Sequence, residues 1–220
     1  MHPSSVPQIE AAPASPAAAV YDLYDAGQLD DARLLRALRA NHARAPGVFF
    51  ERFSPHVERV LTRILGSDAD VPAIVNEAFF RALERIGRLE DADALKRWLT
   101  AIAVNVAREH IRSRRRRGWL RFVGADDMPD PPAPSASPET AEAVRRLYAA
   151  FDAMPADERI ALALRFVDGM ELTEVAEACD VSLATIKRTL ARSESRFVAI
   201  SRRDPVLGEW LERGTRWASQ

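Results

Sequence analysis

The chain has 220 residues, of which 47% are hydrophobic, and a formal net charge of −1 at pH 7. This length can hold one ordinary domain or two small ones, and the near-neutral charge argues against a uniformly basic nucleic-acid coat. The four histidines are scattered without metal-ligand spacing, and the sequence has no glycine-rich phosphate loop or nucleophile elbow. We therefore expect no catalytic activity, no metal site and no cofactor.

The cysteine content and the hydropathy of the sequence are typical of a cytoplasmic protein. The single cysteine, Cys179, cannot form an internal disulfide, and its helical context favours a small buried hydrophobic residue over a redox role. No uninterrupted apolar run approaches the ~20 residues of a membrane span, and the N-terminus lacks the features of a signal peptide. We expect a cytoplasmic protein without a membrane span.

The first part of the chain combines a proline-rich start with a helical domain. Four prolines lie between Pro3 and Pro16, and we expect residues 1–20 to form a disordered tail. Over residues 21–117, apolar residues recur at steps of three and four, which predicts helices and no strands. One such stripe runs from Phe49 to Leu65 and ends at Gly66, and another runs from Ile74 to Ile86.

A third helix of this domain starts near Asp93 and runs into the arginines at 112–117. Trp98 follows Lys96 and Arg97, and basic residues interleaved with an aromatic one suit melted or single-stranded DNA, whose bases stack on rings. The structural alternative is at least as strong, because a tryptophan on an apolar stripe usually belongs to the core. The arginines could likewise be a solvated helix end that the helix dipole favours.

Residues 118–140 are expected to form a flexible, acidic, proline-rich linker. Five prolines lie between Pro129 and Pro138, and the stretch from Phe122 to Glu142 has five acids and no Lys or Arg. Such a composition cannot bury enough apolar surface to offset its ordering entropy. The segment is either an inert spacer or a mask for the neighbouring arginine-rich face.

Residues 141–200 predict a second helical domain that contains a helix-turn-helix from Thr173 to Arg192. Small polar residues at the start of the second helix can approach base edges, and cations further along can hold phosphates. The candidates for these two roles are Ser182, Ala184, Thr185, Lys187, Arg188, Arg192 and Arg196. An ordinary helical hairpin with a solvated basic face is the alternative. Residues 201–220 form a tail with room for one more short helix.

These features in this order resemble the extracytoplasmic-function (ECF) sigma factors of bacterial RNA polymerase. The first domain carries IVNEAFFRAL (74–83) and WLTAIAVNVAREHIRSRRRR (98–117), and the second carries MPADERIALALRFVDGMELTEVAEACDVSLATIKRTLARSESRF (154–197). Several positions depart from the family pattern: Ala101 and Val104 stand where many members have basic residues, Pro72 and Asn76 are atypical, and two more departures lie in the helix-turn-helix. Glu171 is a poorer helix cap than the usual Ser, and Asp180 replaces a turn glycine but tolerates a left-handed backbone.

The resemblance implies an all-α fold with sigma region 2 and sigma region 4, and as partners core RNA polymerase, promoter DNA and an anti-sigma factor. The second helix of the helix-turn-helix would enter the major groove at the minus-thirty-five element, and the acidic linker would run toward the RNA-exit path. Contacts with the minus-ten element would come from Lys96, Arg97, Asn105, Arg108, Arg112 and Arg115. Docking on the polymerase clamp would come from Asp70, Ile74, Glu77, Phe80 and Arg81.

Three other classes of protein make different predictions. An enzyme would turn over a substrate as the pure protein. A stand-alone helix-turn-helix regulator would bind its operator without polymerase, usually as a dimer on a palindrome. A protein-binding scaffold would show no salt-dependent affinity for DNA.

Overall fold

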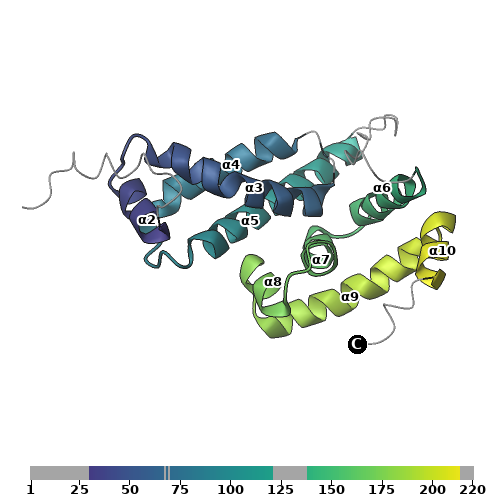
Figure 1. Cartoon of the computed structure of the whole chain (residues 1–220). Helices are drawn as coiled ribbons and strands as arrows, with labels where there is room; N and C mark the ends of the chain where they lie inside the picture. Colours follow the sequence, from purple (N-terminus) through teal and green to yellow (C-terminus); the bar gives the residue numbers. More distant parts are fainter. Residues whose placement is uncertain (1–29, 67, 69, 121–137, 214–220) are drawn as a thin grey trace, which may run out of the picture.

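A computed structural model describes residues 30–66, 68, 70–120 and 138–213 (Figure 1). All regular structure in these ranges is helical, which confirms the all-α prediction. The helices are, in chain order, α2 (Asp31–Arg39), α3 (Ala45–Leu65), α4 (Val71–Arg85), η2 (Ile86–Arg88), α5 (Leu95–Leu120), α6 (Pro138–Asp152), α7 (Ala156–Leu162), the π-turn η3 (Ala163–Val167), α8 (Leu172–Ala178), α9 (Leu183–Ser201) and α10 (Pro205–Arg213). None of them combines the length and apolar character that a membrane crossing requires.

The first domain is a bundle of α2, α3, α4 and α5, in which α3, α4 and α5 all pack on one another. The apolar stripe of α3 forms its centre because residues three and four apart share one face of a helix. Phe49 is fully buried, and its ring centroid lies 5.4 Å from that of Phe53 and 5.2 Å from that of Phe79. Trp98 is partly buried and packs against the same core, as the structural interpretation of that residue predicts.

The turn from α3 to α4 is anchored by the carboxylate of Asp68. Asp68 accepts a hydrogen bond from the backbone N–H of Asp70 and pairs with Arg114 at 2.6 Å and with His110 at 3.4 Å. The interaction with the nearby imidazole of His110, helped by Arg114, lowers the pKa of Asp68 to about 2, although burial opposes the shift. Asp68, Asp70 and His110 offer ligand atoms within 4.8 Å of one another, and one carboxylate oxygen of Asp68 is also paired with Arg114.

The second domain contains the expected helix-turn-helix, made by α8 and α9. Ser182 caps α9 by accepting from the backbone N–H of Thr185 at 3.2 Å. Asp180 adopts the left-handed backbone that the turn was expected to require, with φ of 54°. The N-terminus of α8 is capped more completely than the residue type of Glu171 predicts. The side chain of Glu174 accepts a hydrogen bond from the backbone N–H of Glu171 at 2.8 Å. Cys179 is buried, as expected, and burial raises the pKa of its thiol to about 11.

A short helix, α10, lies in the expected C-terminal tail, and helices also reach into both ends of the expected linker. The helix α10 packs on α6 and α9, and Asp204 accepts from the backbone N–H groups of Val206 and Leu207 in its first turn. On the other side, α5 continues to Leu120 and α6 begins at Pro138, inside the ends of the expected linker. The rest of that linker and the expected N-terminal tail lie outside the described residues.

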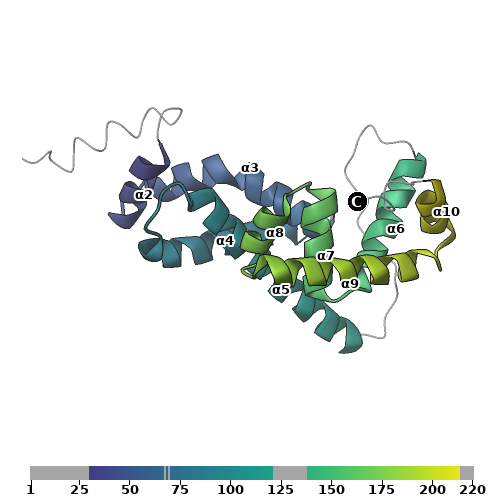
Figure 2. The same cartoon turned by 90° about the horizontal axis from the view of Figure 1, so that it is seen from below.

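The two domains pack directly against each other. The helix α5 contacts both α7 and α8, and α3 contacts η3 (Figures 1 and 2). As a result, α9 runs across the second domain on the side away from α3, and the helix-turn-helix lies beside the middle of α5.

Candidate nucleic-acid interface

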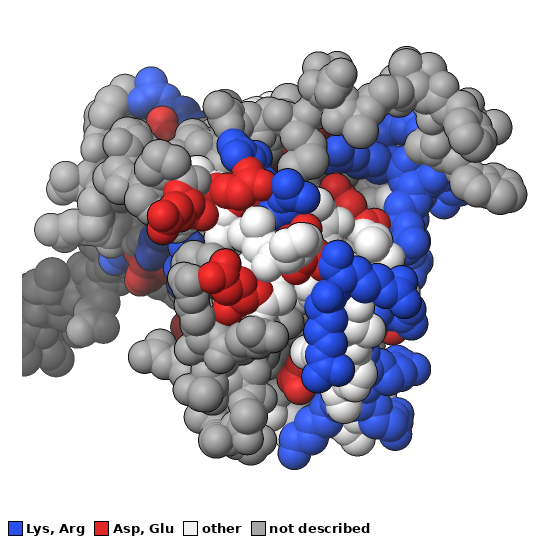
Figure 3. Space-filling model, turned by 90° about the vertical axis from the view of Figure 1, so that its right-hand side faces the viewer, with Lys and Arg blue, Asp and Glu red and all other residues white. Residues whose placement is uncertain are grey.

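The basic face of α9 is open to solvent. Ser182, Ala184, Lys187, Arg188 and Arg192 are exposed, whereas Ile186 and Leu190 face the core. This split follows from the helical period, since positions 186 and 190 lie one turn apart on the inner face. On the face of the molecule drawn in Figure 3, Lys and Arg side chains gather in a band along one side.

Local hydrogen bonds order several side chains of this face. Thr185 accepts from Arg188 at 3.3 Å, and its hydroxyl lies 2.9 Å from that of Ser182. Arg192 donates to the hydroxyl of Thr189 at 3.5 Å. Arg196, predicted to bind DNA, donates to Glu158 of α7 at 2.6 Å, so an acid of the same domain already holds its guanidinium.

The six residues predicted for the minus-ten element all lie on α5, and four of them contact the second domain. Arg108 and Arg112 share the carboxylate of Asp157, at 2.8 and 2.9 Å. Arg115 donates to the backbone carbonyl of Met154 at 3.0 Å, and Arg97 lies 3.6 Å from Glu177. The other two are Asn105, which accepts a hydrogen bond from Arg108, and the exposed Lys96.

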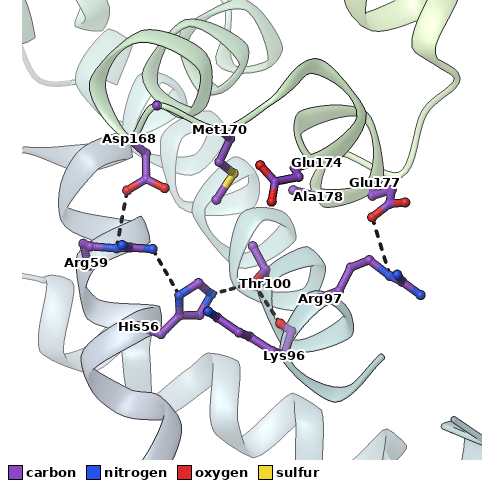
Figure 4. A pocket seen from close by; sticks show the side chains of 11 residues that line it. His56, Arg59, Lys96, Arg97, Thr100, Asp168, Met170, Glu174, Glu177 and Ala178 are labelled. Atoms are coloured by element: carbon purple, nitrogen blue, oxygen red, sulfur yellow. Dashed lines mark hydrogen bonds and ion pairs between the residues drawn. The ribbon is translucent and has the colours of Figure 1, made fainter. Parts of the chain in front are cut away.

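A polar cleft of about 330 Å³ separates the start of α5 from the loop between η3 and α8 (Figure 4). Its first-domain wall carries His56, Arg59, Lys96 and Arg97. Its second-domain wall carries Asp168, Glu174 and Glu177. Arg59 lies 3.4 Å from Asp168, so opposite charges face each other across the cleft at two points.

The imidazole of His56 is held in its neutral form in this cleft. Thr100 donates its hydroxyl proton to the carbonyl of Lys96, so it can only accept from Nε2 of His56, 2.7 Å away. The other ring nitrogen, Nδ1, lies 3.2 Å from a guanidinium nitrogen of Arg59 and therefore acts as an acceptor. Burial, with the charges of Lys96 and Arg59, lowers the pKa of His56 to about 4.

Acidification should therefore destabilise this part of the fold. Between pH 6.5 and about 4, His56 binds a proton when unfolded and remains neutral when folded, so the free energy of unfolding falls as the pH is lowered. We expect a loss on the order of 2 kcal/mol across this window, with no further contribution from His56 below it. Urea denaturation at several pH values should show a flatter dependence for His56→Gln than for wild type. The control His42→Gln should retain the wild-type slope, and an equal slope in all three proteins would contradict the assignment.

The residues predicted to dock on polymerase lie on α4 and form a charged network with α5. Arg81 is half-buried and pairs with Glu77 at 2.7 Å and with Glu109 at 2.8 Å, and these two carboxylates raise its pKa. Phe80 is 59% exposed beside them. Asp70 is exposed at the start of α4, but Ile74 is only 5% exposed. The side chain of Ile74 packs in the core beneath this face, and its contact with polymerase stays a prediction.

Several residues that organise these surfaces were missed by the sequence reasoning. They are Glu109, which completes the Arg81 network, and the second-domain residues Tyr148, Asp157, Arg159 and Glu177. The periodic pattern places Asp157 and Glu177 on polar helix faces, where many acids of the chain occur. Their pairing with α5 depends on how the two domains meet, which the local sequence does not encode.

Comparison with known proteins agrees with the two-domain architecture. The sigma-70 region 2 model matches residues 49–117, and the sigma-70 region 4 model matches residues 144–196. The ECF RNA polymerase sigma-E factor of Haemophilus influenzae is 25% identical over 177 residues, which is 76% of this chain and 93% of that relative. The sigma-E factor of Escherichia coli K12 is 27% identical over 175 residues, with 76% and 91% covered.

Two solved structures share the fold. CnrH, in complex with the cytosolic domain of CnrY, has a TM-score of 0.52 and 19% identity over 82% of this chain and 99% of that chain. The sigma factor RpoE, in complex with the anti-sigma factor NepR from Bartonella quintana, has a TM-score of 0.51 and 20% identity, covering 70% and 95%.

The two family matches stand in the expected order and together span more than half of the chain. A stand-alone regulator is not favoured, because it leaves the region 2 match unexplained. The chain therefore belongs to the ECF group of sigma-70 factors, which are non-enzymatic subunits that direct core RNA polymerase to promoter DNA and initiate transcription.

Proposed function

We propose that α9 recognises the minus-thirty-five element from the major groove. The observation that carries this proposal is the exposure of Lys187, Arg188 and Arg192 on the second helix of a helix-turn-helix whose cap, Ser182, is in place. Small residues at the helix start leave room for base edges, and the cations further along can reach phosphates. Arg196 donates to Glu158 from Nε and its side chain is half-exposed, so its terminal guanidinium nitrogens can still reach a phosphate while the ion pair holds.

Alanine at Lys187 or Arg192 is expected to weaken binding of the upstream element. The cost is roughly 1–3 kcal/mol if the side chain reads a base edge, and less, with a smaller salt dependence, if it holds a phosphate. The effect is measured by comparing transcription from a promoter library by holoenzyme that contains wild-type factor or either alanine variant. Glu194→Ala alters the same helix without removing a cation and serves as the control. Unchanged transcription in both cation variants would contradict the assignment of α9.

We further propose that α5 contacts and helps to melt the minus-ten element. Support comes from the cations that α5 presents along one helix, from Lys96 to Arg115, in the part of the chain that matches region 2. Asn105 and Arg108 are hydrogen-bonded to each other, which orders two of the proposed contact residues. Trp98 supports the helix from the core side.

The remaining proposals concern the protein partners. We propose that α4 docks on the polymerase clamp through Glu77, Phe80 and Arg81, because this face combines an exposed aromatic ring with an ordered charge network. We also propose an anti-sigma factor as a regulator, since the two solved structures named above are complexes and the partner in one of them is named an anti-sigma factor. We propose that the protein acts in the cytoplasm, because core RNA polymerase acts there. Co-purification of the chain with core polymerase subunits from bacterial lysate tests the proposed binding to polymerase.

A further inference from the structure

We propose that Leu183 reads the C5-methyl group of a thymine in the minus-thirty-five element. The inference rests on the proposed role of α9 and deepens it, since it names a base that the helix selects. Thymine methyl groups lie in the major groove, where the first residues of a recognition helix can reach them. Leu183 is the first residue of α9 and is exposed.

The fold leaves two large apolar side chains in solvent at this end of α9. Val181 and Leu183 are each 39% exposed, and they flank Ser182, the residue that caps the helix. Neither Val181 nor Leu183 belongs to the hydrophobic core or packs against it. Single exposed apolar residues are ordinary on a protein surface, but two that flank the cap of the second helix of a helix-turn-helix indicate a contact surface. In the described part of the chain, the other exposed large apolar side chains are Phe50, Phe80 and Phe166.

The helical period places these apolar side chains beside the cations of α9. Leu183 lies one turn before Lys187, and Ala184 lies one turn before Arg188, so the members of each pair are neighbours along the helix surface. All four side chains are exposed. A ligand that covers this surface therefore meets apolar side chains in the first turn and positive charge in the second.

The polar side chains of the first turn already make hydrogen bonds within the helix. The hydroxyl oxygen of Ser182 accepts from the backbone N–H of Thr185 at 3.2 Å and lies 2.9 Å from the hydroxyl of Thr185. The hydroxyl of Thr185 also accepts from Arg188 at 3.3 Å. Because the side chains of Leu183 and Ala184 have no polar atoms, the contacts that this turn offers to a base edge are mainly apolar.

Double-stranded DNA provides a partner for both kinds of side chain. Its phosphates attract the cations, and its major groove exposes the base edges. Guanine, cytosine and adenine present hydrogen-bonding groups there, whereas thymine adds a methyl group. Leu183 can stabilise the complex by removing that methyl group from water, which a polar base edge does not allow. A protein surface is the other conceivable occupant, but the neighbouring cations favour an anionic partner.

The test uses polymerase holoenzyme with the full chain and a promoter that wild-type holoenzyme selects from a library. In a second duplex, uracil replaces every thymine of the minus-thirty-five element, which keeps the base pairs and removes only the methyl groups. Wild-type holoenzyme should bind the uracil duplex about fourfold more weakly, the loss expected when one methyl group stays in water. Leu183→Ala should bind the two duplexes with equal affinity.

Two control variants show whether the effect belongs to the apolar side chain of Leu183. Leu183→Met keeps an apolar side chain of similar volume and should retain the fourfold difference between the duplexes. Phe166→Ala removes an exposed apolar side chain of η3, outside the helix-turn-helix, and should also retain it. Equal binding of both duplexes by wild type, or a selected element without thymine, would overturn the proposal. If Leu183→Ala weakens binding to both duplexes by the same factor, Leu183 contacts a protein surface instead, and the proposal is also overturned.

Lys187→Ala separates these results from a failure of the proposed function. If Lys187→Ala weakens promoter binding while uracil has no effect, α9 still binds the element, and only the reading of thymine is wrong. If neither change affects binding, the assignment of α9 to the minus-thirty-five element fails together with the inference drawn from it.

Discussion

Phe49→Ala is expected to lower the free energy of unfolding of the first domain by about 3–5 kcal/mol. The side chain is fully buried and contacts the rings of both Phe53 and Phe79, so its removal leaves a cavity where α3 and α4 meet. The surrounding helices cannot close that cavity without disturbing the packing of α5, which contacts both. Because a domain of this size is stable by only about 5–15 kcal/mol, a large part of its stability is lost.

Hydrogen exchange read at the amides of α3 and α4 measures this loss in the first domain itself. The control is Phe80→Ala, which removes an identical ring that is 59% exposed, and it should change the stability by no more than about 0.5 kcal/mol. The helix-turn-helix amides of α8 and α9 provide an internal reference in the same sample. Equal protection in Phe49→Ala and Phe80→Ala would mean that the aromatic cluster is not the centre of this core.

The elements that could be predicted from sequence are those whose signal is local. The stripes of α3 and α4 follow a helical period, Gly66 ends α3, and Ser182 caps α9, so each boundary has a nearby physical cause. The left-handed turn at Asp180 could be anticipated for the same reason. The exposed cations of α9 also follow from the period, because Ile186 and Leu190 fix which side of the helix faces the core.

The contacts between the domains could not be predicted, because they join residues that are far apart in sequence and ordinary in composition. Arg159 is one arginine among many, and nothing near it indicates that its partners are the carbonyls of Ile64 and Leu65. The sequence reasoning considered masking of the arginine-rich end of α5 by the acidic linker. Most of that linker lies outside the described residues, and in the described part Asp157, an acid of the folded second domain, pairs with Arg108 and Arg112.

Glu77→Lys is expected to weaken binding to core RNA polymerase by at least about tenfold, if α4 is the docking face. In the folded protein Glu77 and Glu109 hold Arg81 between them, so this network has one more negative than positive charge beside the exposed ring of Phe80. Lysine at position 77 replaces an attraction by a repulsion and adds two units of positive charge to the surface that polymerase must cover. The intramolecular cost is small, about 0.5 kcal/mol for an exposed pair one turn apart, so the fold should persist.

Surface-immobilised core polymerase titrated with each variant gives the affinities directly. Glu58→Lys makes the same change of charge on an exposed position of α3 and should bind like wild type. Phe80→Ala tests the apolar half of the same face and should also weaken binding, while its unfolding curve stays close to that of the wild type. A Glu77→Lys protein that is fully folded and binds polymerase as tightly as Glu58→Lys would exclude α4 as the docking face.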